Sequence, residues 1–353
     1  MTVRRTVAFS KNSSNLFFHI LTKCNLRCRH CYINPEQHGK ENLPLSTIRA
    51  WLDEFASISA TTNVIFLGGE PTLHPDLSGA IKYACDAGFV SITVDTNGYL
   101  FHDILSKVSL QEVDFFSFSL DGATRKTNDR IRGEGSYDIC KKGIQKAIDK
   151  GFSASLIYTV STMNIHELEL MPALIKKLGV DRFFIQVIGL RGKVALVGRT
   201  EDSKDTLQVS RSKWLDVIPA VARKVAELGV TVSYPKVFFE PEDRFECAGL
   251  VAQNYFIFPN GRVYRCPLCE DHPIHSLVFK DNKLIQNESL NESDLFKLNI
   301  PEGCVMNKLI QPQNLSYTIG GVPEYKIACC LLKEEVSGVG CQVSELTELT
   351  PEH

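Results

Sequence analysis

Hydrophobic and polar positions follow two recurring patterns over the first two thirds of the chain. Six short runs rich in β-branched and aromatic residues predict buried strands, and several of them end in Gly, Asn or Asp. They cover residues 15–22, 63–69, 90–98, 113–122, 152–160 and 181–189. Amphipathic stretches predict helices at 45–58, 77–88, 136–151, 165–179 and 212–229. This alternation predicts a parallel sheet with helices outside it, as either a doubly wound sheet or an incomplete barrel.

The pattern changes after about residue 229. Residues 234–246 are rich in Pro and charge and predict a linker, and PNG within 254–266 predicts the turn of a β-hairpin. We therefore expect two domains, an α/β domain over 1–233 and a small cysteine-rich domain over 234–353. Ligands of parallel α/β sheets bind at the carboxyl ends of the strands, so the site is expected there.

Composition places the chain among ordinary folded proteins. It has 353 residues, 44% hydrophobic and 23% charged, with a net charge of −2. This balance favours neither nucleic acid nor a membrane surface as a partner. The first apolar stretch, residues 16–21, is too short for a signal peptide, and no apolar run reaches the length of a membrane helix. We expect a cytoplasmic protein with reduced thiols.

Twelve cysteines are the unusual feature of the composition. Most fall in groups, at positions 24, 28 and 31, at 247, 266 and 269, and at 304, 329, 330 and 341. In a reducing compartment, clustered cysteines indicate metal binding rather than disulfides. The sequence therefore predicts metal sites in both domains.

The first group, Cys24, Cys28 and Cys31, follows the first predicted strand as C-x3-C-x2-C. Three thiolates on one loop can hold one face of an iron–sulfur cluster and leave one iron open for a ligand. A zinc site is the alternative, but it normally has four protein ligands and would draw on a distant Cys or His. The spacing favours iron–sulfur over zinc.

The segment CNLRCRHCY (24–32) resembles the signature of the radical S-adenosylmethionine superfamily. The resemblance continues through GGEP (68–71), TNG (96–98), SLDG (119–122) and IRGEGSYD (131–138). It implies a partial (β/α)6 TIM-like barrel with a 4Fe–4S cluster whose open iron binds S-adenosylmethionine. It also implies one-electron cleavage of that cofactor to methionine and a 5′-deoxyadenosyl radical, which abstracts hydrogen from a substrate.

The resemblance also implies roles for individual residues. Glu70 would accept hydrogen bonds from the methionine ammonium group, and Gly68 and Gly69 would let the backbone approach closely. Arg132 resembles the arginine that pairs with the methionine carboxylate, with Arg130 as the rival.

Three further side chains belong to the same predicted site. Ser119 would hydrogen-bond the ribose or carboxylate, Asn97 would contact the ribose, and Tyr32 would cover the cluster and the adenine. In isolation, each also has an ordinary structural explanation, as a strand-end hydroxyl, a turn residue or a core aromatic. Residues 189–194 (GLRGKV) only loosely resemble a Pro-x-Gly-Arg-Ala motif of the family.

The second domain begins with Cys247, thirteen residues, Gly261, four residues and Cys266. This spacing resembles SPASM and twitch domains, which carry auxiliary 4Fe–4S clusters. The later cysteines are sparser than in SPASM domains, which favours one auxiliary cluster over two, with Cys269 and Cys304 as further ligands. The run from Cys266 to residue 275 also has the form C-x2-C-x2-H-x2-H of a zinc site.

The sequence thus predicts a radical S-adenosylmethionine enzyme that acts on an unactivated C–H bond. Only 23 residues precede Cys24 and the cysteine pattern is abbreviated, which favours a small metabolite, sugar-derived or another natural product. The alternatives are a peptide or protein side chain, a tetrapyrrole, or a non-catalytic iron–sulfur protein. An electron donor such as flavodoxin or ferredoxin is the expected protein partner.

Overall fold

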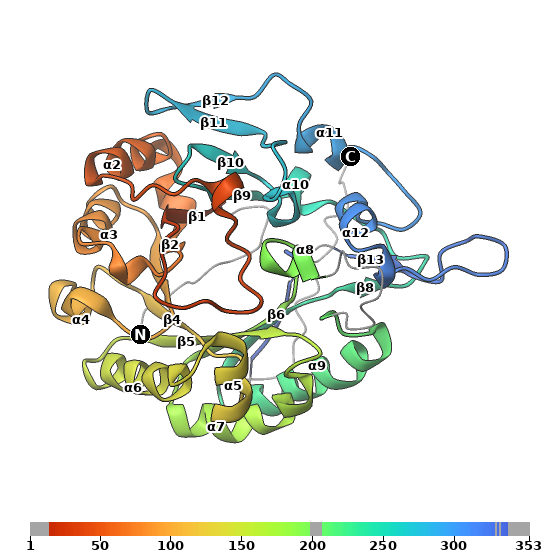
Figure 1. Cartoon of the computed structure of the whole chain (residues 1–353), viewed down its shortest axis with the longest axis horizontal. Helices are drawn as coiled ribbons and strands as arrows, with labels where there is room; N and C mark the ends of the chain where they lie inside the picture. Colours follow the sequence, from red (N-terminus) through yellow and green to blue (C-terminus); the bar gives the residue numbers. More distant parts are fainter. Residues whose placement is uncertain (1–13, 198–206, 329, 332, 338–353) are drawn as a thin grey trace, which may run out of the picture.

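The computed structural model describes residues 14–197, 207–328, 330–331 and 333–337. Seven strands run parallel in sequential order, and six of them are the strands expected from the hydrophobic pattern. They are β1 (Ser14–Leu21), β2 (Thr62–Gly68), β3 (Ser91–Thr96), β4 (Phe115–Ser119), β5 (Ala154–Val160), β6 (Arg182–Val187) and β7 (Thr231–Pro235). A doubly wound sheet would reverse its strand order at a switch point, whereas this order never reverses. The sheet curves around an interior as an incomplete barrel (Figure 1).

Helices cover the outside of this curved sheet (Figure 1). They include α2 (Leu45–Asp53), α3 (Leu77–Asp86), α4 (Ile104–Lys107), α6 (Ser136–Asp149), α7 (Met171–Leu178) and α9 (Arg211–Ala226). Their buried residues recur at helical spacing, as Cys140, Ile144 and Ala147 do in α6. The helix α7 ends at Gly179, whose φ of 71° is the left-handed C-cap that glycine favours.

Two short helices lie near the mouth of the barrel and were not expected from the sequence. The helix α5 (Arg125–Arg132) is almost wholly polar, and Thr124 caps its N-terminus. The helix α8 (Lys193–Val197) follows β6 and lies over the centre of the ring in Figure 1. A further one-turn helix, α1 (Pro35–His38), follows the cysteine loop.

The segment after β7 extends the sheet at both edges. The strand β9 (Gln253–Ile257) pairs in parallel with β1, and β10 (Arg262–Tyr264), β11 (Leu277–Lys280) and β12 (Lys283–Gln286) continue outward from it. At the other edge, β14 (Lys333–Val336) is antiparallel to β7. The hairpin predicted over 254–266 is confirmed, with Gly261 at φ 83° in its turn.

The region predicted as a linker, residues 234–246, differs from that prediction. Tyr234, Val237 and Phe238 are buried in the main apolar core. The strand β8 (Phe238–Phe239) pairs with β13 (Lys326–Ile327). Proline and charge suggested an exposed connection, but the apolar residues between them pack inward. The domain boundary after residue 233 stays a prediction.

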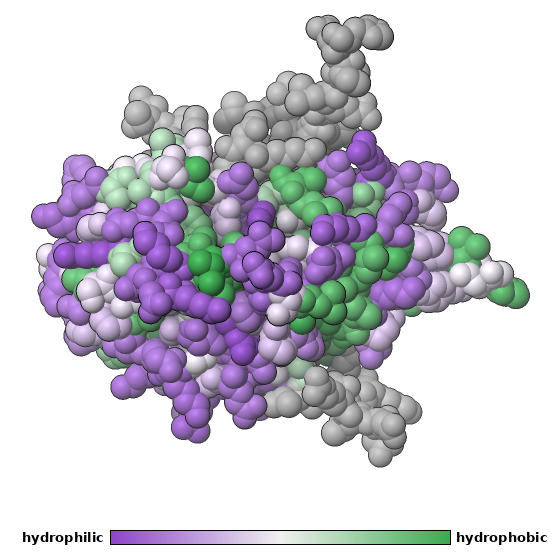
Figure 2. Space-filling view, turned by 90° about the horizontal axis from the view of Figure 1, so that it is seen from above, coloured by the Kyte–Doolittle hydropathy of each residue, from purple (hydrophilic) through white to green (hydrophobic). Residues whose placement is uncertain are grey.

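The segment after β7 has its own core, here called the C-terminal apolar cluster. It contains Phe256, Phe258, Tyr264, Leu268, Phe296 and Met306. Three short helices frame it: α10 (Ala248–Val251), α11 (Glu292–Phe296) and α12 (Val305–Ile310). Apolar residues also reach the surface on the right of the view in Figure 2, where Figure 1 places this segment.

Within the described part of the chain, no helix is both long and apolar enough to span a bilayer.

Candidate functional site

A cavity of about 270 Å³ opens inside the barrel, at the carboxyl ends of the strands. All ten site residues expected in the first domain line it: Cys24, Cys28, Cys31, Tyr32, Gly68, Gly69, Glu70, Asn97, Ser119 and Arg132. Their convergence from five separate segments follows from the parallel sheet, which brings the ends of its strands to one edge. Their individual roles stay predictions.

The three cysteines lie on the loop after β1 and are all half-buried. Burial raises the pKa of Cys24 to about 12 and also raises the pKa of Cys28, which Arg132 partly offsets. Thiols in such a place become ligands when a bound cation stabilises the thiolate.

The arrangement of these thiols fits a cluster better than a single ion. Zinc needs its four ligand atoms within about 2.3 Å of one point. Among the described residues, no three His, Cys, Asp or Glu side chains converge on a single metal ion. That finding covers Cys266, Cys269, His272 and His275, the alternative zinc set. The 4Fe–4S cluster at Cys24, Cys28 and Cys31 stays a prediction.

Glycines at the end of β2 bring the next chain segment against the cysteine loop. A Cβ at Gly68 would overlap the carbonyl oxygen of Leu21, and one at Gly69 would overlap that of Lys23. The backbone N–H of Gly69 donates to Leu21 and that of Glu70 donates to Lys23, both at 3.0 Å. This close approach places Glu70 directly beside the cysteines.

The Glu70 carboxylate is buried and held by four hydrogen bonds. Its Oε1 accepts from the Thr72 N–H (3.1 Å), the Thr72 hydroxyl (2.6 Å) and the Thr96 hydroxyl (2.8 Å), while Oε2 accepts from the Asn97 N–H at 2.7 Å. Burial raises the pKa of Glu70, and these bonds oppose that rise. Because a carboxylate oxygen has two lone pairs, Oε2 can accept one more donor from a ligand in the cavity.

Asn97 is tied to the cysteine loop by its side chain. Its Nδ2 donates to Asn25 Oδ1 at 2.8 Å and lies 3.8 Å from Cys24 Sγ, and its Oδ1 accepts from the Tyr99 N–H. Ser119, at the end of β4, is half-buried with surface in the same cavity. Asn97 thus supports the loop as well as lining the cavity.

Of the two candidate arginines, Arg132 lines the cavity and Arg130 does not. Arg130 is exposed and donates to the Met163 carbonyl, whereas Arg132 Nε pairs with Asp121 Oδ2 at 2.5 Å. The Nη1 atom of Arg132 lies 4.0 Å from Cys28 Sγ. The guanidinium therefore uses one side for Asp121 and turns another toward the cysteine site.

Asp121 and His30 complete this network, and sequence reasoning missed both. Asp121 is fully buried and binds His30 Nε2 at 2.6 Å and the Thr159 N–H at 2.7 Å. Burial opposes its ionisation, but Arg132 and His30 lower the pKa of Asp121 to about 2. Asp121 stands in the motif SLDG and His30 in the motif CNLRCRHCY. Their positions in these motifs could have indicated that they belong to the site.

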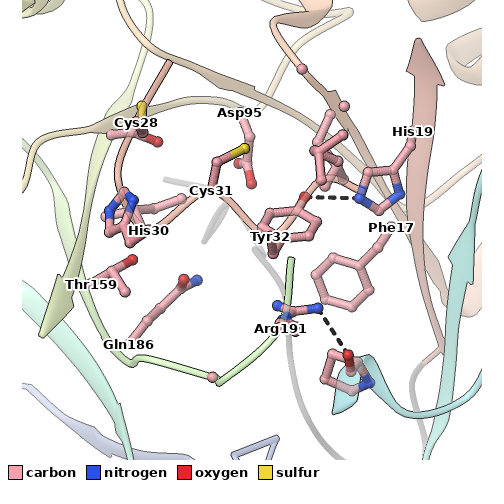
Figure 3. Close-up of a pocket in the computed structure, with 18 of the residues that line it drawn as sticks. Phe17, His19, Cys28, His30, Cys31, Tyr32, Asp95, Thr159, Gln186 and Arg191 are labelled. Carbon is pink, nitrogen blue, oxygen red and sulfur yellow. Dashed lines mark hydrogen bonds between the residues drawn. The ribbon is translucent and has the colours of Figure 1, made fainter. Parts of the chain in front are cut away.

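In another part of the cavity wall, Tyr32 contacts His19 and Arg191 (Figure 3). Its hydroxyl is 2.8 Å from His19 Nε2, and His19 Nδ1 is 2.9 Å from the Ile257 carbonyl. Because a carbonyl only accepts, Nδ1 carries the proton and Nε2 accepts from the tyrosine. Burial lowers the pKa of His19 well below its usual value, which agrees with a neutral ring.

Arg191, which sequence reasoning also missed, joins three segments at the cavity. Its guanidinium stacks on Tyr32, 4.4 Å from the ring centroid, donates to the Pro267 carbonyl at 3.0 Å and pairs with Glu270. Next to it, the Lys193 N–H donates to the Cys31 carbonyl at 3.0 Å. The loose motif at 189–194 thus contacts both the cysteine loop and the segment after β7.

The cysteines after β7 gather around the C-terminal apolar cluster. Cys247, Cys266, Cys269 and Cys304, the ligands predicted from the sequence, lie there together with Cys330, and their role as ligands stays a prediction. Cys247 and Cys304 stand at the N-caps of α10 and α12. Cys329 and Cys341 lie outside the described residues.

The comparisons with known proteins agree with this geometry. Residues 19–175 match the family model described as the Radical SAM superfamily. Residues 19–175 therefore form a radical SAM domain, and the radical SAM family uses S-adenosylmethionine and a 4Fe–4S cluster.

Individual relatives extend the likeness into the segment after β7. The chain is 31% identical to Fe-coproporphyrin III synthase of Methanosarcina barkeri over 63% of this chain and 55% of that protein. It is 27% identical to mycofactocin maturase MftC of Mycobacterium tuberculosis over 82% of this chain and 73% of that one. The chain thus spans little more than half of the first relative's length.

Solved structures share the fold. Streptococcus suis SuiB bound to its precursor peptide SuiA superposes with a TM-score of 0.63 at 15% identity, covering 85% of this chain and 73% of that chain. The expected partial barrel is therefore confirmed.

Proposed function

We propose that this protein reductively cleaves S-adenosylmethionine and uses the resulting radical to abstract hydrogen from a substrate held in the barrel. The observation that carries the proposal is the meeting of Cys24, Cys28 and Cys31 with Glu70 and Arg132 in one cavity. An electron carrier would need the cysteines alone. It would have no use for a buried carboxylate and a guanidinium aimed into the same space.

Each of these residues has a task toward the bound cofactors. The three thiolates would hold a 4Fe–4S cluster, which supplies the electron that cleaves S-adenosylmethionine into methionine and a 5′-deoxyadenosyl radical. Glu70 Oε2 would accept the ammonium group, and the Nη atoms of Arg132 would face the carboxylate. Gly68 and Gly69 leave the room that this placement requires.

The remaining predicted residues would bind the nucleoside. We assign Asn97 and Ser119 to the ribose and Tyr32 to the adenine and the cluster. The His19 hydrogen bond and the Arg191 cation fix the Tyr32 ring from two directions, so its orientation is set before a ligand arrives.

The rest of the cavity would hold the substrate. Its wall includes Asp95, Gln186 and Lys333, with the apolar side chains of Phe17 and Ile157 between them. Polar and ionisable groups among apolar side chains suit a substrate with polar groups at defined positions.

We also propose an auxiliary 4Fe–4S cluster among the cysteines after β7, with Cys247, Cys266, Cys304 and Cys269 as the candidate ligands from sequence. Support comes from their gathering around one apolar cluster beside the main cavity.

For the substrate we now favour a peptide over the small metabolite that the sequence favoured. The mycofactocin maturase aligns with 82% of this chain, including the segment after β7, while the Fe-coproporphyrin III synthase aligns with 63%. SuiB, which shares the fold over 85% of the chain, was solved with a precursor peptide. A tetrapyrrole or another small molecule is the second candidate, because one relative is named Fe-coproporphyrin III synthase and a coproporphyrin is a tetrapyrrole.

A fractionated extract of the source cells tests this choice. The reconstituted enzyme is given the fraction below about 5 kDa, before and after complete digestion with a broad protease, and 5′-deoxyadenosine is measured. We expect stimulation that the protease abolishes. Stimulation that survives digestion would instead establish a small molecule, and heat-treated protease is the control.

A further inference from the structure

A carboxylate that no ligand can touch lies directly behind the cavity wall. Asp121 has an exposed fraction of 0% and does not line the cavity, but its Oδ2 contacts two side chains that do, those of Arg132 and His30. Any role of Asp121 toward the cofactor must therefore pass through these neighbours. Such a role rests on the task that the proposed function gives to Arg132.

Asp121 is itself held by partners other than the arginine. Its Oδ1 accepts the Thr159 N–H at 2.7 Å. Its own N–H donates to Asn128 Oδ1 at 2.9 Å, and its carbonyl accepts from Asn164 Nδ2 at 3.1 Å. A Cβ at the next residue, Gly122, would lie 2.4 Å from the Asn128 nitrogen, so this turn packs closely against α5. The carboxylate is thus fixed by β5, by α5 and by the loop after β5.

The Arg132 side chain, in contrast, depends on Asp121 for its orientation. Arg132 is the last residue of α5, and the several rotatable bonds of an arginine side chain are costly to order. Its Nε pairs with Asp121 Oδ2 at 2.5 Å, while its Nη1 lies 4.0 Å from Cys28 Sγ. The guanidinium therefore has one edge toward a fixed anion and another toward the cysteine site.

The same carboxylate oxygen also ties the cysteine loop to this arrangement. Asp121 Oδ2 lies 2.6 Å from Nε2 of His30, which stands inside the cysteine motif. Because a carboxylate only accepts, Nε2 carries the proton. The Arg29 N–H also donates to the Ile131 carbonyl at 2.8 Å, so the loop and the end of α5 are joined by backbone as well.

We propose that Asp121 is a positioning residue for the carboxylate of S-adenosylmethionine, which orients Arg132 relative to the cysteine loop before the cofactor binds. A guanidinium that is already in place loses less side-chain freedom on binding. Affinity for the cofactor carboxylate then depends on Asp121, although Asp121 lies outside the cavity.

Two ligands that differ only by the carboxylate test this role. The holoenzyme is reconstituted without oxygen and left unreduced, and the Kd values for S-adenosylmethionine and for its decarboxylated analogue are measured by equilibrium dialysis. The ratio of the two Kd values isolates the preference for the carboxylate, because a general loss of structure weakens both ligands alike.

The positioning role predicts a definite series of ratios. We expect the wild type to prefer S-adenosylmethionine by about ten-fold or more and Arg132→Gln to remove this preference. Asp121→Asn, which keeps the size of the side chain, should reduce the preference by roughly 3- to 10-fold at unchanged iron content. In the Arg132→Gln background, Asp121→Asn should change the ratio no further, because nothing is left to orient.

Glu167→Gln is the matched control for loss of a buried carboxylate beside α5. Glu167 accepts from the Thr124 and Thr127 hydroxyls, both at 2.7 Å, at the end of the helix away from Arg132. We expect a lower melting temperature and the wild-type ratio. An equal loss of preference in Glu167→Gln and Asp121→Asn would assign the effect to the stability of α5 and overturn the positioning role.

The other outcomes separate this inference from the proposed function. A wild type with its full iron content and no preference, or an Arg132→Gln variant that keeps the preference, would overturn the task of Arg132 and the inference with it. A ratio that is unchanged or raised in Asp121→Asn, while Arg132→Gln loses the preference, would overturn the inference alone. A rise is the result expected from removal of a nearby negative charge if orientation has no effect.

Arg132→Lys keeps the inference testable if Asp121→Asn does not fold. Lysine keeps the positive charge but lacks the Nε atom through which Asp121 holds the guanidinium. We expect the preference to fall by about three-fold or more. A wild-type ratio would show that a charge at this position suffices without orientation, which would contradict the proposal.

Discussion

At the scale of single residues, Glu70 combines full burial with one oxygen that can still accept a donor from the cavity. The other oxygen is held by Thr72 and Thr96, so the carboxylate cannot rotate away from the ligand. Hydrogen bonds to charged groups contribute about 1.5–3 kcal/mol each, and each 1.4 kcal/mol corresponds to a factor of ten in affinity.

Replacement of Glu70 by Gln keeps the size of the side chain and removes its charge. We expect the Kd for S-adenosylmethionine, measured by its effect on the EPR signal of the reduced cluster, to rise by roughly 10- to 100-fold. The iron content should stay at the wild-type value, because Glu70 is not a proposed cluster ligand. An unchanged Kd for S-adenosylmethionine would show that Glu70 does not bind this cofactor.

Asp95 is a second carboxyl in the cavity, and its ionisation should cost stability. Burial raises the pKa of Asp95 to about 7, partly offset by its bond to Ser117 and by Lys333, from an ordinary value of 3.8. Between these two values the unfolded chain loses its proton while the folded chain keeps it. Stability therefore falls as the pH rises through this window.

The Asp95→Asn variant should be free of this penalty. We expect its melting temperature to exceed that of the wild type by an amount that grows from pH 4 to pH 7 and then levels off, measured without added S-adenosylmethionine. Asp86→Asn, at the exposed end of α3, is the matched control. A constant difference across this range would contradict the assignment.

The sequence predicted ten residues that line the cavity, all of them within linear motifs, because motif order and strand order coincide in a parallel sheet. It missed Asp121 and His30, whose side chains meet across 91 positions, and Arg191 and Glu270, which meet across 79. Pairs of this kind carry no local pattern. They become visible only when the fold brings the two segments together.

At the scale of elements, the loop after β6 depends on a glycine. Gly192 has φ 59°, and a Cβ there would lie about 2.5 Å from the carbonyl oxygen of Tyr32 and 2.6 Å from that of Cys31. The loop is thus pressed against the backbone that carries a proposed cluster ligand.

Gly192→Ala should therefore disturb the cysteine loop. We expect a lower melting temperature and less iron per chain after reconstitution. Gly135→Ala is the matched control, because Gly135 also has a positive φ, 77°, but has nothing within 4 Å of its added Cβ. If both variants lose the same amount of iron, backbone strain rather than contact with the cysteine loop explains the effect.

The sequence predicted well those elements whose apolar residues form a continuous run or repeat at a regular spacing. The six strands are continuous apolar runs and the long helices repeat at helical spacing. The polar helix α5 has no such stripe. Its Thr124 and Thr127 are instead held by hydrogen bonds to Glu167, which a local pattern cannot reveal.

At the scale of the whole molecule, the segment after β7 is built into the barrel sheet. Asn63 donates to Asn15 at 2.9 Å and Asn15 to Asn254 at 2.8 Å, so one chain of buried amides crosses β2, β1 and β9. The last two residues lie 239 positions apart, and no local signal could have predicted that β9 pairs with β1. The pairing places the C-terminal cysteines beside the cavity.

Loss of the auxiliary site should separate cofactor cleavage from substrate chemistry. In a Cys247→Ala, Cys266→Ala variant the primary cysteines and Glu70 are untouched, so we expect some 5′-deoxyadenosine without modified substrate. Metal binding and folding are often coupled, so the variant must first be shown to be soluble and monodisperse. Substrate turnover at the wild-type rate would make this site purely structural.

The central claim is tested most directly by 5′-deoxyadenosine formation. Anaerobically reconstituted, reduced protein is incubated with S-adenosylmethionine, and the nucleoside is quantified by mass spectrometry beside the Cys28→Ala variant. The account predicts 5′-deoxyadenosine and methionine in equal amounts from the wild type and none above background from the variant. Equal formation by both proteins, or none by a wild type with its full iron content, would contradict it.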